Sequence, residues 1–298
     1  MTTVAVLGLG AMGLPMARHL TATCTVRGYD PDPARRTAED VDGTAASARA
    51  AATGADVVLL AVLDAAQLAD ALWGDDGVAE VLTPGSVVLL TSTVGIEAVR
   101  AAAVRLAGAG LLLVDAPVSG GPVRAGQGEL RVTVGADDEA WAAAGPVLEA
   151  MASTLTRVGP RPGDGQAMKT VNQLLCGVHI AAAAEALALA EALGLDPALA
   201  LDTLQAGAAA SFMLGDRGPR MLQAGDEGGA EVRSRLDIFV KDLGLVGTAA
   251  RAAGLPTPVA AAAEQLFLLG RAQGLAARDD SSVVNVLVPL EDPTAGDS

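Results

Sequence analysis

The first half of the chain alternates short runs rich in Val, Leu and Thr with alanine-rich stretches that suit helices. This alternation is typical of α/β domains, in which helices cover both faces of a parallel sheet. The run at 57–62 is apolar at every position, as expected of a strand buried on both faces. The pattern predicts strands at 3–7, 25–30, 57–62, 87–91, 111–115, 130–134 and 155–158.

The pattern changes at 159–165, a cluster of Gly, Pro and Asp that favours a turn, and no strand is predicted after it. Residues 166–192 indicate one helix of about 40 Å, and further helices are predicted at 197–205, 235–253, 258–273 and from near Asp280. We therefore expect an α/β domain over 1–162 and an all-α domain over 163–290, joined by a long interdomain helix. Residues 291–298 form an acidic tail predicted to be disordered.

Composition and charge narrow the class of partner. The chain has 298 residues, 51% of them hydrophobic, which is ample for two cores. Its formal net charge of -15 repels phosphate backbones and anionic lipids, so we expect neither nucleic acid nor membrane as a partner. The long apolar helix is interrupted by Glu185 and Glu191, and we predict no signal peptide or spanning segment. Cys24 and Cys176 lack metal-ligand spacing, which favours a reducing cytoplasmic location and no metal site.

A glycine-rich segment joins the first predicted strand to the helix that follows it. In a GxGxxG pattern the glycines allow a tight turn, close approach of the backbone to a pyrophosphate, and packing of the helix on the strand. The helix N-terminus adds amide donors. A turn kept for packing alone is the alternative, but this position predicts that 1–162 is a Rossmann domain that binds NAD(P). The residues expected at the cofactor are Gly8, Leu9, Gly10, Ala11, Met12 and Gly13.

Asp30 closes the second predicted strand, where a carboxylate accepts hydrogen bonds from the ribose of NAD and repels the 2′-phosphate of NADP. NAD is therefore the expected cofactor. Arg27, Arg35 and Arg36 are close in sequence and leave NADP possible. Thr93 follows the fourth strand at the edge where open α/β sheets bind ligands, although an ordinary helix cap would explain a threonine there equally well.

The chain contains only two lysines, Lys169 and Lys241. Lys169 lies near the start of the long helix, with Asn172 and Gln173 on about the same face. Unlike arginine, lysine can release a proton, provided that burial and nearby charge lower its pKa from ~10.4 to ~7–8. We therefore predict proton transfer at Lys169, with a solvated surface lysine as the alternative. Lys241 precedes Asp242, and a surface charge is the alternative there.

Ser119, Gly120 and Gly121 follow the fifth predicted strand and form either a compact donor loop suited to a carboxylate or a simple tight turn. Together with the glycine-rich segment, the Lys169 helix and the Lys241-Asp242-Leu243 run, this loop resembles the β-hydroxyacid dehydrogenase family. The four motifs occur in the family's order and cover nearly the whole chain.

The resemblance implies a role for each matching residue. Lys169 matches the catalytic lysine, and Thr93 matches a residue near the nicotinamide. Ser119, Gly120 and Gly121 match the loop that holds the substrate carboxylate. Lys241 matches a lysine that reaches the active site or the cofactor from the helical domain. The family often has Asn where Gln173 stands, so the resemblance leaves open whether Asn172 or Gln173 contacts the substrate.

The resemblance also implies NAD-dependent oxidation of a small β-hydroxy acid such as 3-hydroxyisobutyrate, with Lys169 as general acid and base, in a homodimer or homotetramer. The segments 173–185 and 236–244 look more like the branch that acts on four-carbon sugar acids such as L-threonate, and a tartronate semialdehyde reductase is a further alternative. Imine reductases share the architecture but usually replace the lysine. A non-catalytic nucleotide-binding protein is disfavoured by Lys169 together with Ser119.

Overall fold

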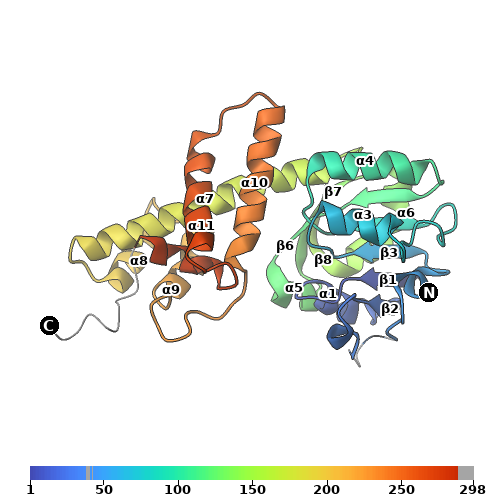
Figure 1. The fold of residues 1–298 in the computed structure, drawn as a ribbon, viewed down its shortest axis with the longest axis horizontal. Coiled ribbons are helices and arrows are strands. Elements are labelled where there is room, and N and C mark those ends of the chain that lie inside the picture. The colour runs from blue at the N-terminus through green and yellow to red at the C-terminus, as the bar shows by residue number, and fades with distance from the viewer. Residues whose placement is uncertain (38–40, 42, 288–298) are drawn as a thin grey trace. The chain divides into compact units, whose positions relative to one another are not determined.

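The computed structural model describes residues 1–37, 41 and 43–287. The chain forms two compact units, Met1–Lys169 and Thr170–Ser298. The first contains the sheet and the second contains helices (Figure 1). The predicted acidic tail, 291–298, lies outside the described residues.

The first unit is built on one eight-stranded sheet. Its main parallel part has the order β2-β1-β3-β4-β5, and β8 pairs in parallel with β7 at the other edge. Because β2 and β3 lie on opposite sides of β1, the carboxyl ends of these strands form the switch point at which open α/β sheets bind ligands. The strands are β1 (Thr3–Leu7), β2 (Thr25–Tyr29), β3 (Val57–Leu60), β4 (Val87–Leu90), β5 (Leu112–Asp115), β6 (Val118–Ser119), β7 (Leu130–Gly135) and β8 (Ala152–Gly159).

One edge of the sheet departs from the predicted parallel arrangement. Strand β7 runs antiparallel to β5 and β6, pairing Asp115 with Gly135 and Ser119 with Arg131. The short connection explains the antiparallel pairing of β6 with β7, because only α5 (Gly121–Gln127), a helix of 7 residues, lies between them, whereas a parallel crossover needs about a dozen residues or more. Ser119, expected in a loop, therefore lies in the short strand β6.

Alternate residues of each parallel strand supply two hydrophobic cores, one on each face of the sheet. Val4 and Val6 belong to the core that α1, α5 and α6 cover, and Ala5 and Leu7 to the core that α2, α3 and α4 cover. The bounds of these elements are α1 (Gly13–Leu20), η1 (Pro33–Thr37), α2 (Ala48–Ala52), α3 (Ala65–Trp73), α4 (Ile96–Ala107) and α6 (Asp138–Met151).

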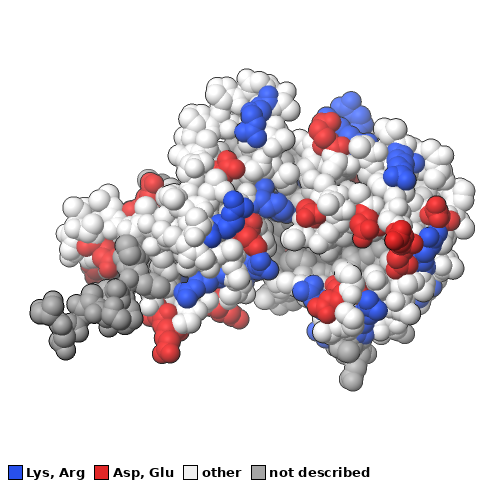
Figure 2. All heavy atoms as spheres, viewed as in Figure 1, with Lys and Arg blue, Asp and Glu red and all other residues white. Residues whose placement is uncertain are grey.

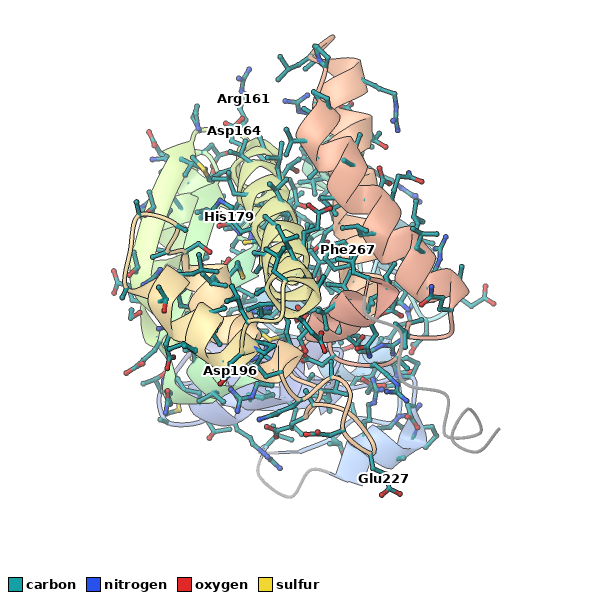
Figure 3. All side chains as sticks on the ribbon, turned by 90° about the vertical axis from the view of Figure 1, so that its left-hand side faces the viewer. Arg161, Asp164, His179, Asp196, Glu227 and Phe267 are labelled. Atoms are coloured by element: carbon teal, nitrogen blue, oxygen red, sulfur yellow. The ribbon has the colours of Figure 1, made fainter. Side chains whose placement is uncertain are left out.

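The long helix α7 (Asp164–Ala192) begins in the first unit and continues into the second. Figure 3 labels Asp164 in its first turn and His179 farther along it. Stacked Phe239 and Phe267, with ring centroids 5.3 Å apart, belong to the core of the second unit. The remaining elements of this unit are α8 (Pro197–Gln205), α9 (Phe212–Met221), α10 (Leu236–Ala252), α11 (Pro258–Ala272) and the 3-10 helix η2 (Asp280–Val286).

Helix α7 is long and apolar enough to cross a membrane, with a mean hydropathy of 1.6 over its most apolar stretch. Inside the protein, however, 44% of that stretch is buried. Ile180, Ala184 and Leu187 of α7 contribute to the core of the second unit. These contacts are those of a core helix, which explains an apolar composition without a membrane.

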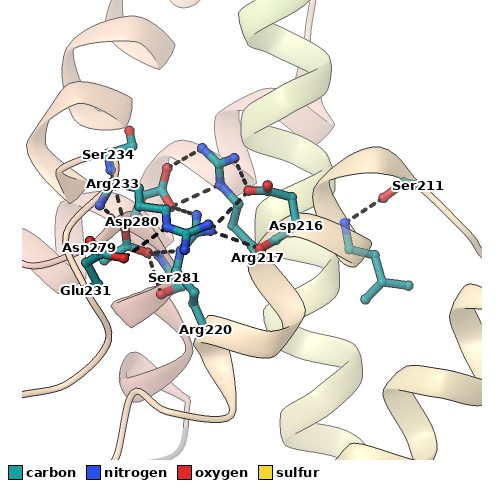
Figure 4. A network of polar contacts seen from close by, with 11 residues as sticks. Ser211, Asp216, Arg217, Arg220, Glu231, Arg233, Ser234, Asp279, Asp280 and Ser281 are labelled. Carbon is teal, nitrogen blue, oxygen red and sulfur yellow. Dashed lines mark hydrogen bonds and ion pairs between the residues drawn. The ribbon is translucent and has the colours of Figure 1, made fainter. Parts of the chain in front are cut away.

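A buried ion network joins α9 to η2 (Figure 4). Arg217 donates to both carboxylate oxygens of Asp280 at 3.1 and 2.8 Å, and Arg220 Nε donates to Asp279 Oδ1 at 2.9 Å. Burial raises the pKa of Asp280, and the hydrogen bond from Arg217 opposes that rise. The sequence pattern missed α9, because its Gly and Pro residues are poor helix formers whose cost is offset here by these buried contacts.

Candidate functional site

In the glycine-rich turn between β1 and α1, two glycines have no room for a side chain and a third lies on an open side. Gly8 has a φ of 99°, and a Cβ there would lie 2.2 Å from Ala61 O. A Cβ on Gly13 would lie 1.8 Å from Gly8 O, so only glycine lets α1 start this close to the turn. Among the described residues, a Cβ on Gly10 would meet only Arg35 Nη1 within 4 Å, at 3.4 Å. The backbone at Gly10 is therefore open to a ligand.

The start of α1 adds backbone donors to this turn. The Leu14 N–H donates to Gly10 O at 3.1 Å, which begins the hydrogen-bond ladder of the helix. The amides of residues 11–13 precede that ladder and are among those that a helix leaves to caps or ligands. Met12 occupies the N-cap position and makes no side-chain cap. The open glycine and these amides fit the pyrophosphate of a dinucleotide.

Asp30 follows β2 directly, and its side chain is only 3% exposed. Its Oδ2 accepts a hydrogen bond from Leu9 N–H at 2.8 Å and its Oδ1 accepts one from Asp32 N–H at 2.9 Å. Asp30 therefore fastens the glycine-rich turn to the end of β2, which the sequence did not indicate. Arg35 Nη1 lies 3.7 Å from Asp30 Oδ2, so a carboxylate and a half-exposed guanidinium stand together at this end of the sheet.

Thr93 lies after β4 in a loop that a buried glutamine holds in place. Gln166 Oε1 accepts hydrogen bonds from Val94 N–H and Gly95 N–H at 3.0 and 3.1 Å. Gln166 Nε2 donates to Ser92 O at 3.0 Å. Gln166 is fully buried and belongs to the first turns of α7. Sequence reasoning did not single it out, because a lone polar residue in an apolar helix gives no signal until its distant partners are known.

Asp115, the last residue of β5, anchors the same part of α7. Its Oδ2 accepts hydrogen bonds from Gly163 N–H and Gln166 N–H at 2.8 and 2.9 Å, and its Oδ1 accepts one from Gln166 Nε2 at 2.8 Å. Burial raises the pKa of Asp115, and the hydrogen bonds from Gln166 and Gly163 oppose that rise. A Cβ on Gly165 would lie 2.5 Å from Asp115 O, so glycine lets α7 begin directly against the strand.

The structure brings Lys169 and Ser119 together. Lys169 Nζ donates to Ser119 Oγ at 2.8 Å, and both residues are half-buried. Lys169 lies three residues after Gln166 on α7, and Ser119 pairs with Arg131 in the sheet. The amine and the hydroxyl are therefore both attached to fixed backbone.

Gly120 and Gly121 turn the chain from β6 into α5 with φ angles of 138° and 73°. Both angles lie in the region that side chains rarely adopt, so glycine is required at each position. A Cβ on Gly120 would also lie 2.9 Å from Arg124 Cδ. The turn starts directly after Ser119, whose position it helps to set.

In the second unit, Asn172 and Gln173 of α7 are linked to Asp242 of α10. Asn172 Nδ2 donates to Gln173 Oε1 at 2.9 Å, and Gln173 Nε2 donates to Asp242 Oδ2 at 2.5 Å. Lys241 Nζ forms an ion pair with Asp242 Oδ1 at 3.2 Å. Gln173 and Asp242 are buried, whereas Asn172 is exposed. Asp242 was not among the predicted site residues.

The predicted site residues thus form two groups, and α7 connects them. Lys169 ends the first unit, and Asn172 and Gln173 follow three and four residues later on the same helix. The first unit holds Gly8, Leu9, Gly10, Ala11, Met12, Gly13, Asp30, Thr93, Ser119, Gly120, Gly121 and Lys169, and the second holds Asn172, Gln173 and Lys241.

Two family models match successive parts of the chain. The NAD binding domain of 6-phosphogluconate dehydrogenase matches residues 3–159, which include the glycine-rich turn. The model described as NAD-binding of NADP-dependent 3-hydroxyisobutyrate dehydrogenase matches residues 163–287, which include Lys169. Both descriptions agree with the fit of the turn to a dinucleotide, and the protein binds NAD(P).

Whole-length relatives extend this result. The chain is 40% identical over 293 residues to the L-threonate dehydrogenase of Cupriavidus necator, covering 97% of each chain. It is 38% identical over 296 residues to the L-threonate dehydrogenase of Escherichia coli K12, covering 98% of this chain and 97% of the relative. The crystal structure of a 3-hydroxyisobutyrate dehydrogenase from Salmonella typhimurium matches with a TM-score of 0.88 and 39% identity, over 96% of this chain and 100% of that one. The chain therefore belongs to the β-hydroxyacid dehydrogenase family and is an NAD(P)-dependent dehydrogenase.

Proposed function

We propose that this protein oxidises a four-carbon sugar acid of the L-threonate type, with NAD+ as cofactor and Lys169 as general base. The observation that carries the proposal is the 2.8 Å hydrogen bond between Lys169 Nζ and Ser119 Oγ. It unites the amine and the carboxylate-binding loop that the family resemblance implies. The full-length matches to L-threonate dehydrogenases favour this substrate over 3-hydroxyisobutyrate, the first expectation from the sequence.

Lys169 is suited to move a proton because lysine, unlike arginine, can exist as a neutral amine. In the neutral form one N–H donates to Ser119 Oγ, and the lone pair remains to accept the proton of the substrate hydroxyl. In the reverse direction the ammonium form returns a proton to the carbonyl oxygen. When bound, NAD+ supplies the hydride acceptor for oxidation of the alcohol carbon.

Ser119 is suited to hold the substrate carboxylate. Its oxygen accepts from Lys169, which leaves its own O–H to donate to an anion. Local donors of this kind are needed, because the net charge of -15 repels an anionic substrate. Figure 2 shows basic and acidic side chains interspersed among uncharged ones rather than gathered in one basic patch on the face in view.

The preference for NAD rests on Asp30, whose carboxylate stands at the end of β2 where the ribose of a dinucleotide binds. Arg35, 3.7 Å away and 54% exposed, is a cation suited to a 2′-phosphate, which keeps NADP possible. Arg36 also lies beside Asp30, but its Nε donates to Asp30 O at 2.6 Å and its Nη2 to Pro31 O at 3.0 Å. Arg27 is less suited, because its Nη1 donates to Thr53 O at 2.9 Å.

A cytoplasmic homodimer or homotetramer is part of the proposal. Leucines at the end of α7 and in α8 are well exposed, with Leu189 at 59%, Leu193 at 68% and Leu199 at 65%. A second copy of the chain would cover such side chains. The cytoplasmic location is proposed because Cys24 and Cys176 belong to no metal-ligand or CxxC spacing, as expected in a reducing compartment. Light scattering after size exclusion measures the assembly directly.

One kinetic screen tests the function. Formation of NADH or NADPH is followed with L-threonate, 3-hydroxyisobutyrate, glycerate and L-serine. Consumption of NADH or NADPH is followed with tartronate semialdehyde. We expect the highest kcat/KM with L-threonate and NAD+. A clear preference for 3-hydroxyisobutyrate, the substrate named for the Salmonella structure, would reject the sugar-acid class while leaving the chemistry intact. No turnover with any acid would reject the catalytic proposal.

A further inference from the structure

We propose that Asp242 is a positioning residue that makes Asn172 present its carbonyl oxygen to the substrate, so that the site selects an acid with a second hydroxyl. The inference rests on the proposed function and names the feature of the substrate that this part of the site recognises. It follows from a one-way chain of hydrogen bonds that runs from the exposed Asn172 to the buried Asp242.

The direction of these two hydrogen bonds is set at Asp242, their buried end. A carboxylate only accepts hydrogen bonds, and Asp242 receives Gln173 Nε2 at 2.5 Å on one oxygen and faces Lys241 Nζ at 3.2 Å on the other. If the Gln173 amide were flipped, its oxygen would face the carboxylate in a buried position, where like charges repel strongly. The Gln173 amide therefore keeps its NH₂ toward Asp242 and its oxygen toward Asn172.

The orientation of Gln173 then decides the orientation of Asn172. Because Gln173 offers an oxygen, Asn172 must turn its NH₂ inward, where Nδ2 donates to Gln173 Oε1 at 2.9 Å and also contacts Cys176 Sγ at 3.4 Å. Asn172 is exposed, and no residue in the described part of the chain donates a hydrogen bond to its Oδ1. An isolated asparagine could present either end of its amide, whereas this one presents an acceptor.

Close packing of α7 on α10 holds the two ends of the hydrogen bond between Gln173 and Asp242 in place. A Cβ on Gly177, one turn after Gln173, would lie 2.7 Å from Leu243 Cδ2. Glycine at this position therefore allows Leu243, the neighbour of Asp242, to pack against α7. The two helices meet beside the hydrogen bond that joins Gln173 to Asp242.

The place of the acceptor indicates what it recognises. Asn172 lies three residues after Lys169 on α7, and such helix neighbours have Cβ atoms about 5–6 Å apart. Side chains at this spacing can contact nearby carbons of one small molecule. An acceptor there favours a second O–H donor besides the hydroxyl that is oxidised. A polyhydroxy acid carries such a group, whereas 3-hydroxyisobutyrate has a methyl group and only the one hydroxyl.

The test compares Asp242→Asn with wild type on L-threonate and 3-hydroxyisobutyrate. Asparagine keeps the shape but offers both NH₂ and oxygen, so Gln173 and Asn172 lose their fixed orientation. We expect kcat/KM for L-threonate to fall at least tenfold, mainly through KM, and the KM or Ki of 3-hydroxyisobutyrate to change less than threefold. Asp237→Asn, the same change earlier on α10 in an ion pair with Arg235, is the matched control and should alter neither.

Asn172→Ala provides a second test at an exposed position that does not threaten folding. It should cause the same selective loss, and adding Asp242→Asn should cause no further loss, because both act through one hydrogen bond to substrate. Equal losses for the two acids, or fully additive losses, would overturn the proposal. An unchanged KM for NAD+ in Asp242→Asn supports the proposal. A raised KM for NAD+ would overturn it, because the variant would then act through Lys241 on cofactor binding.

L-serine separates the two kinds of donor that an acceptor recognises. If kcat/KM falls more for L-threonate than for L-serine in both variants, the acceptor recognises a hydroxyl, as proposed. A fall confined to L-serine would overturn the proposal, because the acceptor would then recognise an ammonium group. Wild-type protein that turns over none of these acids contradicts the proposed function itself. Wild-type activity with an unchanged Asp242→Asn variant contradicts only this inference.

Discussion

Lys169 Nζ and Ser119 Oγ lie 2.8 Å apart although 50 residues separate them in the chain. Each is attached to backbone that is fixed by other residues. Ser119 pairs with β7, and the first turns of α7 are tied to Asp115 through Gly163 and Gln166. The short distance is thus a product of the fold and not of one flexible lysine side chain.

Lys169→Ala should lower kcat at least about 10³-fold, because general acid–base catalysis contributes ~10²–10⁴ and the hydrogen bond to Ser119 is lost as well. NAD+ affinity, measured by titration calorimetry, should stay within about threefold. Lys169→Arg is the sharper variant, because it keeps a cation beside Ser119 but cannot release a proton. Substantial turnover by the arginine variant would contradict the role of Lys169 as a base.

Gly13→Ala should abolish cofactor binding or destabilise the first unit. The added Cβ would lie 1.8 Å from Gly8 O and 3.1 Å from Ala61 Cβ, and neither neighbour is the end of a flexible side chain. Gly126→Ala, whose Cβ would rest in ordinary contact 3.7 Å from Pro15 Cβ, is the matched control within a helix. Thermal unfolding with and without NAD+ should show loss of the cofactor-induced shift only in Gly13→Ala.

Arg35→Ser should lower kcat/KM for NADP+ about tenfold or more and leave that for NAD+ within about threefold. The reason is that the half-exposed Arg35 guanidinium lies 3.7 Å from the Asp30 carboxylate, and charge-assisted bonds to phosphate are strong. Arg27→Ser is the control, since Arg27 is engaged by Thr53 O. A parallel loss with both cofactors would instead indicate that Arg35 serves the pyrophosphate or the fold.

Local patterns in the sequence predicted the parts of the protein that depend on neighbours in the chain. The family, the α/β and all-α fold class and the NAD(P) cofactor are confirmed, and the strand at 3–7 and the helix at 197–205 have the predicted bounds. The glycine-rich turn was recognisable from the sequence, because the turn and the start of α1 require glycine at fixed positions such as Gly8 and Gly13. The roles of Lys169 and the other site residues stay predictions.

Features that depend on distant partners were not predictable. Strand β6 is only 2 residues long, and the antiparallel direction of β7 depends on the length of a connection rather than on strand composition. Gln166 looks like an ordinary polar helix residue until its partner Asp115 is known. Asp242 stands in a recognised motif, but its hydrogen bond with Gln173 depends on the packing of α7 against α10. Asp30 was predicted to accept hydrogen bonds from the ribose. The hydrogen bond that its Oδ2 accepts from Leu9 N–H was not predicted, because it joins residues 21 positions apart.

Asp280→Asn should destabilise the second unit by about 3–5 kcal/mol. Arg217 donates to both oxygens of this fully buried carboxylate, and removing its charge leaves a buried guanidinium without its main partner (Figure 4). Glu231→Gln breaks an exposed ion pair with Arg233 in the same unit and should change the free energy of unfolding by less than about 1 kcal/mol. Denaturant unfolding of both variants measures the difference, and similar values would contradict the importance of burial.

Asp115→Asn should destabilise the protein in a pH-dependent way. The carboxylate accepts three hydrogen bonds from Gly163 and Gln166, and an amide would turn a donor toward some of these donors, at a cost of about 1–3 kcal/mol. Because burial raises the pKa of Asp115 above its ordinary value of 3.8, the folded state binds this proton more tightly than the unfolded state. Protonation of the Asp115 carboxyl therefore stabilises the folded state. This stabilisation is fully present below a pH of 3.8 and is lost as the pH rises through the raised pKa of the folded state. The free energy of unfolding of wild type minus that of Asp115→Asn should therefore be larger near pH ~4 than at pH ~7. An equal difference at both pH values would show that the hydrogen bonds cancel the effect of burial on this carboxylate.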